Sequence, residues 1–308
     1  MIKNIMEVIM KHFISLLDFT HEELVGILDR ADYLATAWRN NQMPRSLKNK
    51  NIGLWFYGNG FRNRLAFELG AKALGADVSY IPGELGIDEP LQDIGYYLQN
   101  WYHALIIRAK CHQDLTYLSE YIKIPIINAR TEFSHPCEVM GDLQFIRRER
   151  KSLEGLKVVF VGEVTNLCMS WFEAAVGFPI QVTQVAPENY LAKDRLIKNM
   201  NAKALGEITV TSDLDSCIKY ADIVYTDCWP HTSNEDEKEM IKKLFLPYQI
   251  TGSLLKKTHD RSLFLPCPPV TRGQEVSEDA MLSKFCKNYE DKNYLLHSQN
   301  AILEFICS

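Results

Sequence analysis

The sequence has 308 residues, of which 46% are hydrophobic and 24% charged, and its formal net charge is −5. This length and composition predict a globular chain of two domains and exclude a disordered protein. The net negative charge argues against a nucleic-acid-binding protein, which usually presents a basic face. The cysteines form no CxxC pair and no apolar run is long enough to span a membrane. We therefore expect no zinc site, no membrane interaction and a reducing, cytoplasmic location.

Helix and strand patterns alternate along the first half of the chain. A helix is expected within residues 10–41, where Thr20 and Glu23 form a capping box ahead of an apolar stripe. We interpret residues 1–9, which precede Met10, as an extension before the natural start. The sequence predicts buried strands at 52–57, 78–81, 104–107 and 125–127, and helices at 91–98, 115–121 and 135–151. The basic run at 147–151 is expected to be a solvated helix face.

The same alternation restarts at Leu156 and continues to a closing helix at 287–306. Strands are expected at 157–163, 180–187, 207–211, 222–227 and 262–266, separated by helices. Continuous apolar strands that alternate with helices are typical of parallel sheets covered on both faces. The predicted fold class is therefore α/β, with two doubly wound parallel-sheet domains joined by interdomain helices. We place the domains at 10–148, completed by 287–308, and at 149–286.

The first strand leads into a glycine turn, Gly58-Asn59-Gly60, and then into a helix that carries Arg62. A helix N-terminus after such a turn offers free backbone N–H groups and a favourable dipole to an anion. Arg62 and Arg108 each follow a strand, so both can reach one crevice at the carboxyl edge of the sheet. Their planar forks suit phosphate or carboxylate. A tight turn with solvated arginines remains the alternative at this stage.

With these positions established, the chain resembles the aspartate/ornithine carbamoyltransferase family, nearest the ornithine type, from Met10 onward. The segment FYGNGFRNRLAFE corresponds to the family's F-x-x-x-S-T-R-T-R-x-S-F-E phosphate turn, and HPCEVMGD corresponds to H-P-x-Q-x-x-x-D. VGEVTNLCMS, YTDCW and LPCPPVTRGQEV correspond to the acceptor-side loops, and LLHSQNA to the closing helix. The order of these segments along nearly the whole chain makes the resemblance specific.

The resemblance implies that the first domain binds carbamoyl phosphate and the second binds an amine acceptor, ornithine or an ornithine-like amino acid. It also implies a homotrimer with the site at a subunit boundary, small-molecule substrates and no metal or organic cofactor. Carried over by position, Arg62, Arg108, His135 and Cys267 are the expected catalytic residues. The expected donor-binding residues are Gly60, Phe61, Arg62, Asn63, Glu84, Arg108, His135, Glu138 and Pro268. The expected acceptor-binding residues are Asn166, Asp227, His231, Thr232 and Arg272.

Each role is an expectation of the resemblance. Arg62 and Arg108 would hold the phosphate, and His135 would donate to the carbamoyl oxygen. Asn166 and Asp227 would hold the amino-acid end of the acceptor, and Cys267 would lie beside the reacting amine. Taken singly, these side chains also suit purely structural roles: His135 and Asp227 as helix caps and Cys267 as a core thiol. The motifs around these residues favour roles in the active site over the structural roles.

The chain departs from the family pattern around the donor. Gly60 and Phe61 replace a serine and a threonine, Asn63 replaces a threonine, and Pro268 replaces a leucine. Glu84 and Glu138 stand where the family has glutamines, and Leu295 where the closing helix has an arginine. One cation is lost and two carboxylates are gained around a dianion. At an effective dielectric of ~20, each like-charge contact near 4 Å costs about 4 kcal/mol before relaxation.

Three hypotheses follow from this balance. The first is a carbamoyltransferase that acts on an amino acid. The second is a transferase that uses a different donor in the remodelled pocket. The third is a non-catalytic trimeric paralogue that binds ligands without turning them over.

Overall fold

A computed structural model of the protein describes residues 11–87 and 89–308. The expectations about residues 1–9 and Met10 fall outside this part of the chain. The first domain contains a parallel sheet of strand order β2-β1-β3-β4. Its strands are β1 (Asn51–Phe56), β2 (Asp77–Ile81), β3 (Ala104–Arg108) and β4 (Ile126–Arg130).

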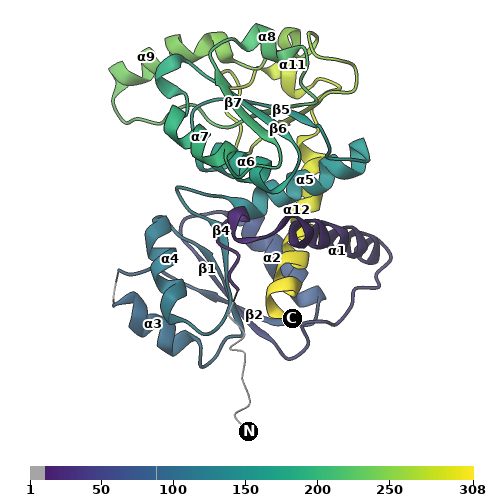
Figure 1. Ribbon diagram of the computed structural model, residues 1–308. Helices are drawn as coiled ribbons and strands as arrows, with labels where there is room; N and C mark the ends of the chain where they lie inside the picture. The colour runs from purple at the N-terminus through teal and green to yellow at the C-terminus, as the bar shows by residue number, and fades with distance from the viewer. Residues whose placement is uncertain (1–10, 88) are drawn as a thin grey trace.

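Helices surround this first sheet. They are η1 (Leu16–Asp18), α1 (His21–Arg39), α2 (Phe61–Ala73), α3 (Leu91–Leu98), α4 (His112–Tyr121) and α5 (Pro136–Arg150). The predicted capping box is present, since Thr20 caps α1 and Glu23 accepts from the Thr20 backbone N–H. Figure 1 shows α3 and α4 on one side of the sheet and α1, α2 and the closing helix α12 (Asn288–Cys307) on the other.

The second domain contains a parallel sheet of strand order β7-β6-β5-β8-β9. Its strands are β5 (Lys157–Val161), β6 (Gln181–Val185), β7 (Glu207–Thr211), β8 (Ile223–Thr226) and β9 (Leu263–Pro266). Its helical segments are α6 (Asn166–Gly177), η2 (Glu188–Tyr190), α7 (Asp194–Asn201), α8 (Leu214–Ile218), α9 (Glu235–Phe245), η3 (Leu246–Tyr248), α10 (Gly252–Leu255) and α11 (Glu278–Met281). The predicted α/β class with two parallel sheets is confirmed.

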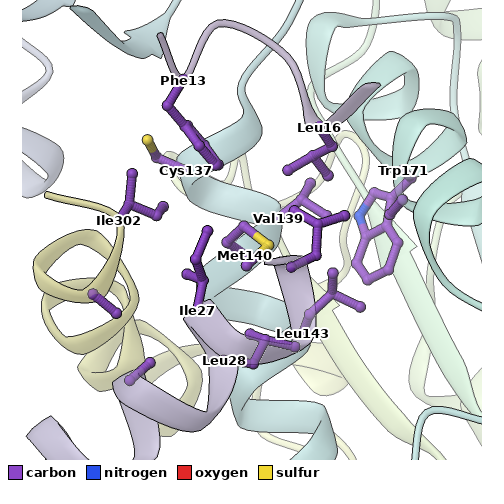
Figure 2. Packing of buried hydrophobic residues seen from close by; sticks show 14 of the residues in the cluster. Phe13, Leu16, Ile27, Leu28, Cys137, Val139, Met140, Leu143, Trp171 and Ile302 are labelled. Atoms are coloured by element: carbon purple, nitrogen blue, oxygen red, sulfur yellow. The ribbon is translucent and has the colours of Figure 1, made fainter. Parts of the chain in front are cut away.

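Helices α5 and α12 (Asn288–Cys307) lie where the two domains meet (Figure 1). Helix α12 packs against α5, α1 and α2. Figure 2 shows Val139, Met140 and Leu143 of α5 surrounded by Ile27 and Leu28 of α1, and by other side chains of the cluster. Most of α5 is buried. This packing fixes the first turn of α5 in position relative to α12.

The basic end of α5 is not the solvated face that the sequence predicted. The Arg147 guanidinium lies 2.7 Å from both Asp29 and Asp32 on α1, and Arg150 pairs with Asp222. That prediction was wrong because α5 runs between the domains, so its last turn meets acidic side chains from both. Among residues 11–87 and 89–308, the structure contains no helix with the length and apolarity needed to cross a bilayer.

Candidate active site

A cavity of about 420 Å³ opens at the carboxyl ends of strands from both sheets. In each sheet the chain reverses its direction of winding at this point, between β1 and β3 and between β5 and β8. Such switch points are where open α/β sheets bind ligands. The lining residues are Asn59, Gly60, Phe61, Arg62, Asn63, Arg108, Arg130, His135, Glu138, Asn166, Leu167, Asp227, Cys228, Cys267, Pro268 and Pro269.

The turn between β1 and α2 is shaped for close approach by Arg108. Gly60 is the N-cap of α2, has a φ of +26° and makes no side-chain cap. A Cβ at Gly60 would lie 2.7 Å from Cδ and 2.9 Å from Nε of Arg108. Glycine is therefore required there, and the lost serine hydroxyl leaves room for a guanidinium against the helix N-terminus.

Arg108 and Arg62 are the cations nearest this turn. Burial, followed by the charge of Arg130, lowers the pKa of Arg108 to about 10, and its buried Nε has no hydrogen-bond partner among the described residues. Arg62 is exposed, and its guanidinium lies 4.6 Å from the centre of the Phe61 ring. The Phe61 side chain is 45% exposed, so the ring forms part of the cavity wall and does not fill the cavity.

Arg130 is a lining residue that the sequence analysis missed. The predicted strand ended at Ile127, but β4 continues to Arg130, which pairs with Arg108 on β3 after a shift in register. Arginine at a strand end was the signal that selected Arg108. The same signal would have selected Arg130 if the strand had been drawn to its true end.

His135 lies at the N-cap of α5, and its side chain faces the cavity. Its backbone N–H donates to Ser170 Oγ at 2.8 Å, which ties the start of α5 to α6 of the second domain. Burial lowers the pKa of His135 to about 3, so the imidazole is neutral at neutral pH. Its Nδ1 has no partner among the described residues, and Nε2 lies 3.6 Å from a Glu138 oxygen.

Glu138 is buried and held by two donors. Asn63 Nδ2 donates to it at 3.1 Å, and the ammonium of Lys292 on α12 lies 2.8 Å away. Burial alone would raise the pKa of Glu138, but the charge of Lys292 and these hydrogen bonds lower it to about 2. Lys292 also lies 2.7 Å from Asp142 and 2.8 Å from Asp291. The added carboxylate is thus ionised and paired with a lysine that it shares with two further carboxylates.

Leu295, which stands where the family has a cation, is buried between α12 and α5 against Gly141. Lys292 lies about one helical turn before it on the same helix. The closing helix therefore still brings a cation towards the donor side of the cavity, at a position that the sequence comparison did not select.

The second domain contributes Asn166, Asp227 and Cys267 to the cavity. Asn166 Nδ2 donates to the Thr131 carbonyl at 2.5 Å, so this amide joins the two domains. Asp227 accepts from the Cys228 backbone N–H at 2.8 Å, and burial raises the pKa of its carboxyl. Burial also raises the pKa of Cys267 well above its usual range, so the group beside the cavity is a neutral thiol.

Four expected site residues do not line the cavity: Glu84, His231, Thr232 and Arg272. Glu84 lies in the loop between β2 and α3. Thr232 is half-buried and donates to Glu237 at 2.5 Å, and the exposed Arg272 pairs with Glu278. Thr232 and Arg272 are held by partners within their own loops, and a binding role for any of the four residues stays a prediction.

Comparison with known proteins agrees with this architecture. Residues 11–148 match the family model "Aspartate/ornithine carbamoyltransferase, carbamoyl-P binding domain", and residues 154–306 match "Aspartate/ornithine carbamoyltransferase, Asp/Orn binding domain". An ornithine carbamoyltransferase from Pseudomonas syringae pv. tomato is 31% identical over 96% of both chains. One from Methanosphaera stadtmanae is 32% identical over 96% of this chain and 99% of its own.

Solved structures show the same relationship. The ornithine carbamoyltransferase of Pyrococcus furiosus superimposes with a TM-score of 0.89 at 29% identity, over 96% of each chain. That of Campylobacter jejuni superimposes with a TM-score of 0.87 at 28% identity, over 96% of this chain and 99% of the other. The chain belongs to the aspartate/ornithine carbamoyltransferase family of transferase enzymes.

Proposed function

We propose that the protein transfers a carbamoyl group from carbamoyl phosphate to the amine of an amino acid, ornithine or an ornithine-like acceptor, and releases phosphate. The observation that carries this proposal is the convergence of Arg62, Arg108 and His135 with Asp227 on one cavity between the domains. The residues expected for both halves of the reaction therefore line a single cavity.

The donor binds on the first domain. The N-terminus of α2, Arg62 and Arg108 hold the phosphate, since helix N–H groups and planar forks both suit phosphate oxygens. The partnerless Nε of Arg108 supports this role, because a buried donor without a partner is costly until an anion arrives. The neutral imidazole of His135 donates its N–H to the carbamoyl oxygen, where negative charge develops.

The acceptor binds against the second domain with its neutral amine directed at the carbamoyl carbon. The amine nitrogen forms the new C–N bond, the bond from carbon to the bridging phosphate oxygen breaks, and phosphate leaves with that electron pair. The surplus amine proton passes to the departing phosphate. Asp227 and Asn166 orient the acceptor, and the Cys267 thiol borders the reacting amine.

The ion pair of Glu138 with Lys292 supports carbamoyl phosphate as the donor. The alternatives of another donor or a non-catalytic protein rested on the surplus negative charge around the phosphate. Lys292 supplies a cation at 2.8 Å from Glu138, which offsets part of that negative charge. Within a single chain, Glu84 does not line this cavity.

The test is carbamoyl transfer from carbamoyl phosphate to L-ornithine, measured as citrulline formation. We expect activity in the wild type and its near loss in Arg62→Ala. The matched control is Arg64→Ala, because Arg64 lies on the same helix but outside the cavity, with its guanidinium 5.3 Å from the Tyr80 ring. Wild-type activity in Arg62→Ala would contradict the proposed anion site.

We also propose the domain limits 10–148 with 287–308 and 149–286, and a homotrimer. The packing of α12 on α5, α1 and α2 supports assigning the closing helix to the donor domain. Leu65 and Leu69 on α2 are 41% and 52% exposed, an apolar face that supports self-association. Light scattering on the purified protein tests the trimer, and a monomeric mass would contradict it.

A further inference from the structure

Three arginines line the cavity: Arg62, Arg108 and Arg130. In the part of the chain that the structure describes, none of them forms an ion pair with a carboxylate. The cavity also contains two carboxylates, but Glu138 is already paired with Lys292. One phosphate held by α2, Arg62 and Arg108 would leave Arg130 unmatched, so the cavity suits a second anionic group.

Arg130 lies two strands away from the phosphate turn, along the same carboxyl edge of the first sheet. The turn follows β1, whereas Arg130 ends the edge strand β4, and β3 lies between them. Two strand spacings separate β1 from β4 by about 10 Å. Arg108, on the intervening strand, is the arginine that packs against Gly60. Of the two arginines at strand ends, Arg130 is therefore on the strand farther from the phosphate turn.

Arg130 is next to the groups contributed by the second domain. The carbonyl of the following residue, Thr131, accepts from Asn166 at 2.5 Å. The positive charge of Arg130 also acts on Asp227 across the cavity and lowers the pKa of that carboxyl against the larger effect of burial. Arg130 of the first domain and Asp227 of the second both line the cavity, so a cation and a carboxylate reach it from opposite domains.

This pair of charges matches the two ends of an amino-acid zwitterion. Asp227 can pair with an ammonium, and the fork of Arg130 can donate two hydrogen bonds to a carboxylate. Asn166 already donates one amide hydrogen to the Thr131 carbonyl, so it has fewer free donors for that carboxylate than Arg130 has. An amine without a carboxylate would leave a half-buried guanidinium unpaired, which disfavours its binding.

We propose that Arg130 binds the carboxylate of the acceptor and so restricts acceptors to amines that carry one. This inference rests on the proposed function, because it assigns the acceptor end of the same cavity. It makes Arg130 a specificity residue that discriminates ornithine from its decarboxylated counterpart, 1,4-diaminobutane.

The experiment compares L-ornithine with 1,4-diaminobutane in the wild type, Arg130→Met and Arg195→Met. Arg195 is an exposed arginine on α7 and serves as the matched control. Binding of each amine is measured by calorimetry in the presence of inorganic phosphate, and KM for carbamoyl phosphate and for each amine is measured by carbamoyl transfer. Circular dichroism confirms that each variant is folded.

We expect the wild type and Arg195→Met to bind ornithine at least about tenfold more tightly than 1,4-diaminobutane. In Arg130→Met this preference disappears, while KM for carbamoyl phosphate stays within about threefold. An unchanged preference in Arg130→Met, or no preference in the wild type, would overturn the inference. So would a rise confined to KM for carbamoyl phosphate, which would make Arg130 a phosphate ligand.

The two proposals fail in different ways. Ornithine binding that depends on Arg130, without carbamoyl transfer by the wild type, would reject the proposed function and retain the carboxylate site. Carbamoyl transfer with an amine preference that does not depend on Arg130 would retain the function and reject the carboxylate site.

Discussion

The ammonium nitrogen of Lys292 lies 2.8 Å from a carboxylate oxygen of Glu138, and this buried ion pair joins α12 to α5 directly behind the cavity. The other Glu138 oxygen accepts from Asn63, whose own carbonyl oxygen accepts from Gln299 of α12 at 2.6 Å. The closing helix thus fixes a cavity-lining carboxylate through both of its oxygens. Hydrogen bonds therefore join the carbamoyl-phosphate side of the cavity to the C-terminal helix.

Lys292→Met is expected to destabilise the protein by about 3 kcal/mol or more, because three buried carboxylates lose their common cation. Urea unfolding measures the effect. The double variant Lys292→Met/Glu138→Gln should recover part of the loss, since one of those carboxylates is then neutral. Lys238→Met breaks a surface pair with Glu235 and serves as the control, with little expected change. Equal losses in both lysine variants would contradict the role of the buried cluster.

Glu138→Gln is expected to strengthen carbamoyl-phosphate binding about three- to tenfold, because the cavity wall loses one negative charge near a dianion. The side chain can still accept from Asn63, so the wall keeps its shape. Calorimetric titration with carbamoyl phosphate measures the change. Glu149→Gln is the control, as Glu149 is exposed on the same helix. Weaker binding in Glu138→Gln would indicate that the carboxylate itself contacts the donor.

Gly60→Ala and Gly58→Ala separate backbone strain from the contact with Arg108. Both glycines have positive φ, so each alanine is expected to cost about 1 kcal/mol of stability. Only the Gly60 variant places a methyl group 2.7 Å from Arg108 Cδ, whereas a Cβ at Gly58 meets nothing within 4 Å. We expect phosphate affinity to fall in Gly60→Ala and to stay near the wild-type value in Gly58→Ala. Equal phosphate affinities would show that the position of Arg108 does not depend on Gly60.

Glu173 predicts a specific pH dependence of stability. Burial raises the pKa of this carboxyl to about 7, although Leu16 and Ser134 donate to it at 3.3 Å and 3.2 Å. Between its unfolded pKa, about 4.3, and pH 7 the native state binds the extra proton, so its contribution to stability falls as pH rises. Melting temperatures between pH 5 and 8 should show this slope in the wild type.

The variant Glu173→Gln should flatten that slope, because the side chain no longer titrates. Glu239→Gln, at an exposed position on α9, should leave it unchanged. A wild-type slope that persists in Glu173→Gln would assign the pH dependence to another group.

The local patterns predicted most elements closely. The structure has α3 at Leu91–Leu98 and β7 at Glu207–Thr211, as the apolar periodicity indicated. The end of β4 was missed because Asn128 and Arg130 are polar and resemble the start of a loop. Asn128 is fully buried, and its amide donates to the Ile14 carbonyl, a partner far away in the sequence. A strand extended by such distant bonds cannot be identified from its own composition.

The sequence by itself determined the order of strands and helices, the arginines that follow β1 and β3, and the family. These features can be recognised from hydrophobic periodicity and from short motifs of residues that are neighbours in the sequence. Only the tertiary structure decided which charges meet. Lys292 and Asp142 are 150 positions apart, yet their side chains lie 2.7 Å from each other. The net charge of the cavity wall therefore depends on how α12 packs against α5, because an ion pair forms wherever packing brings two side chains together.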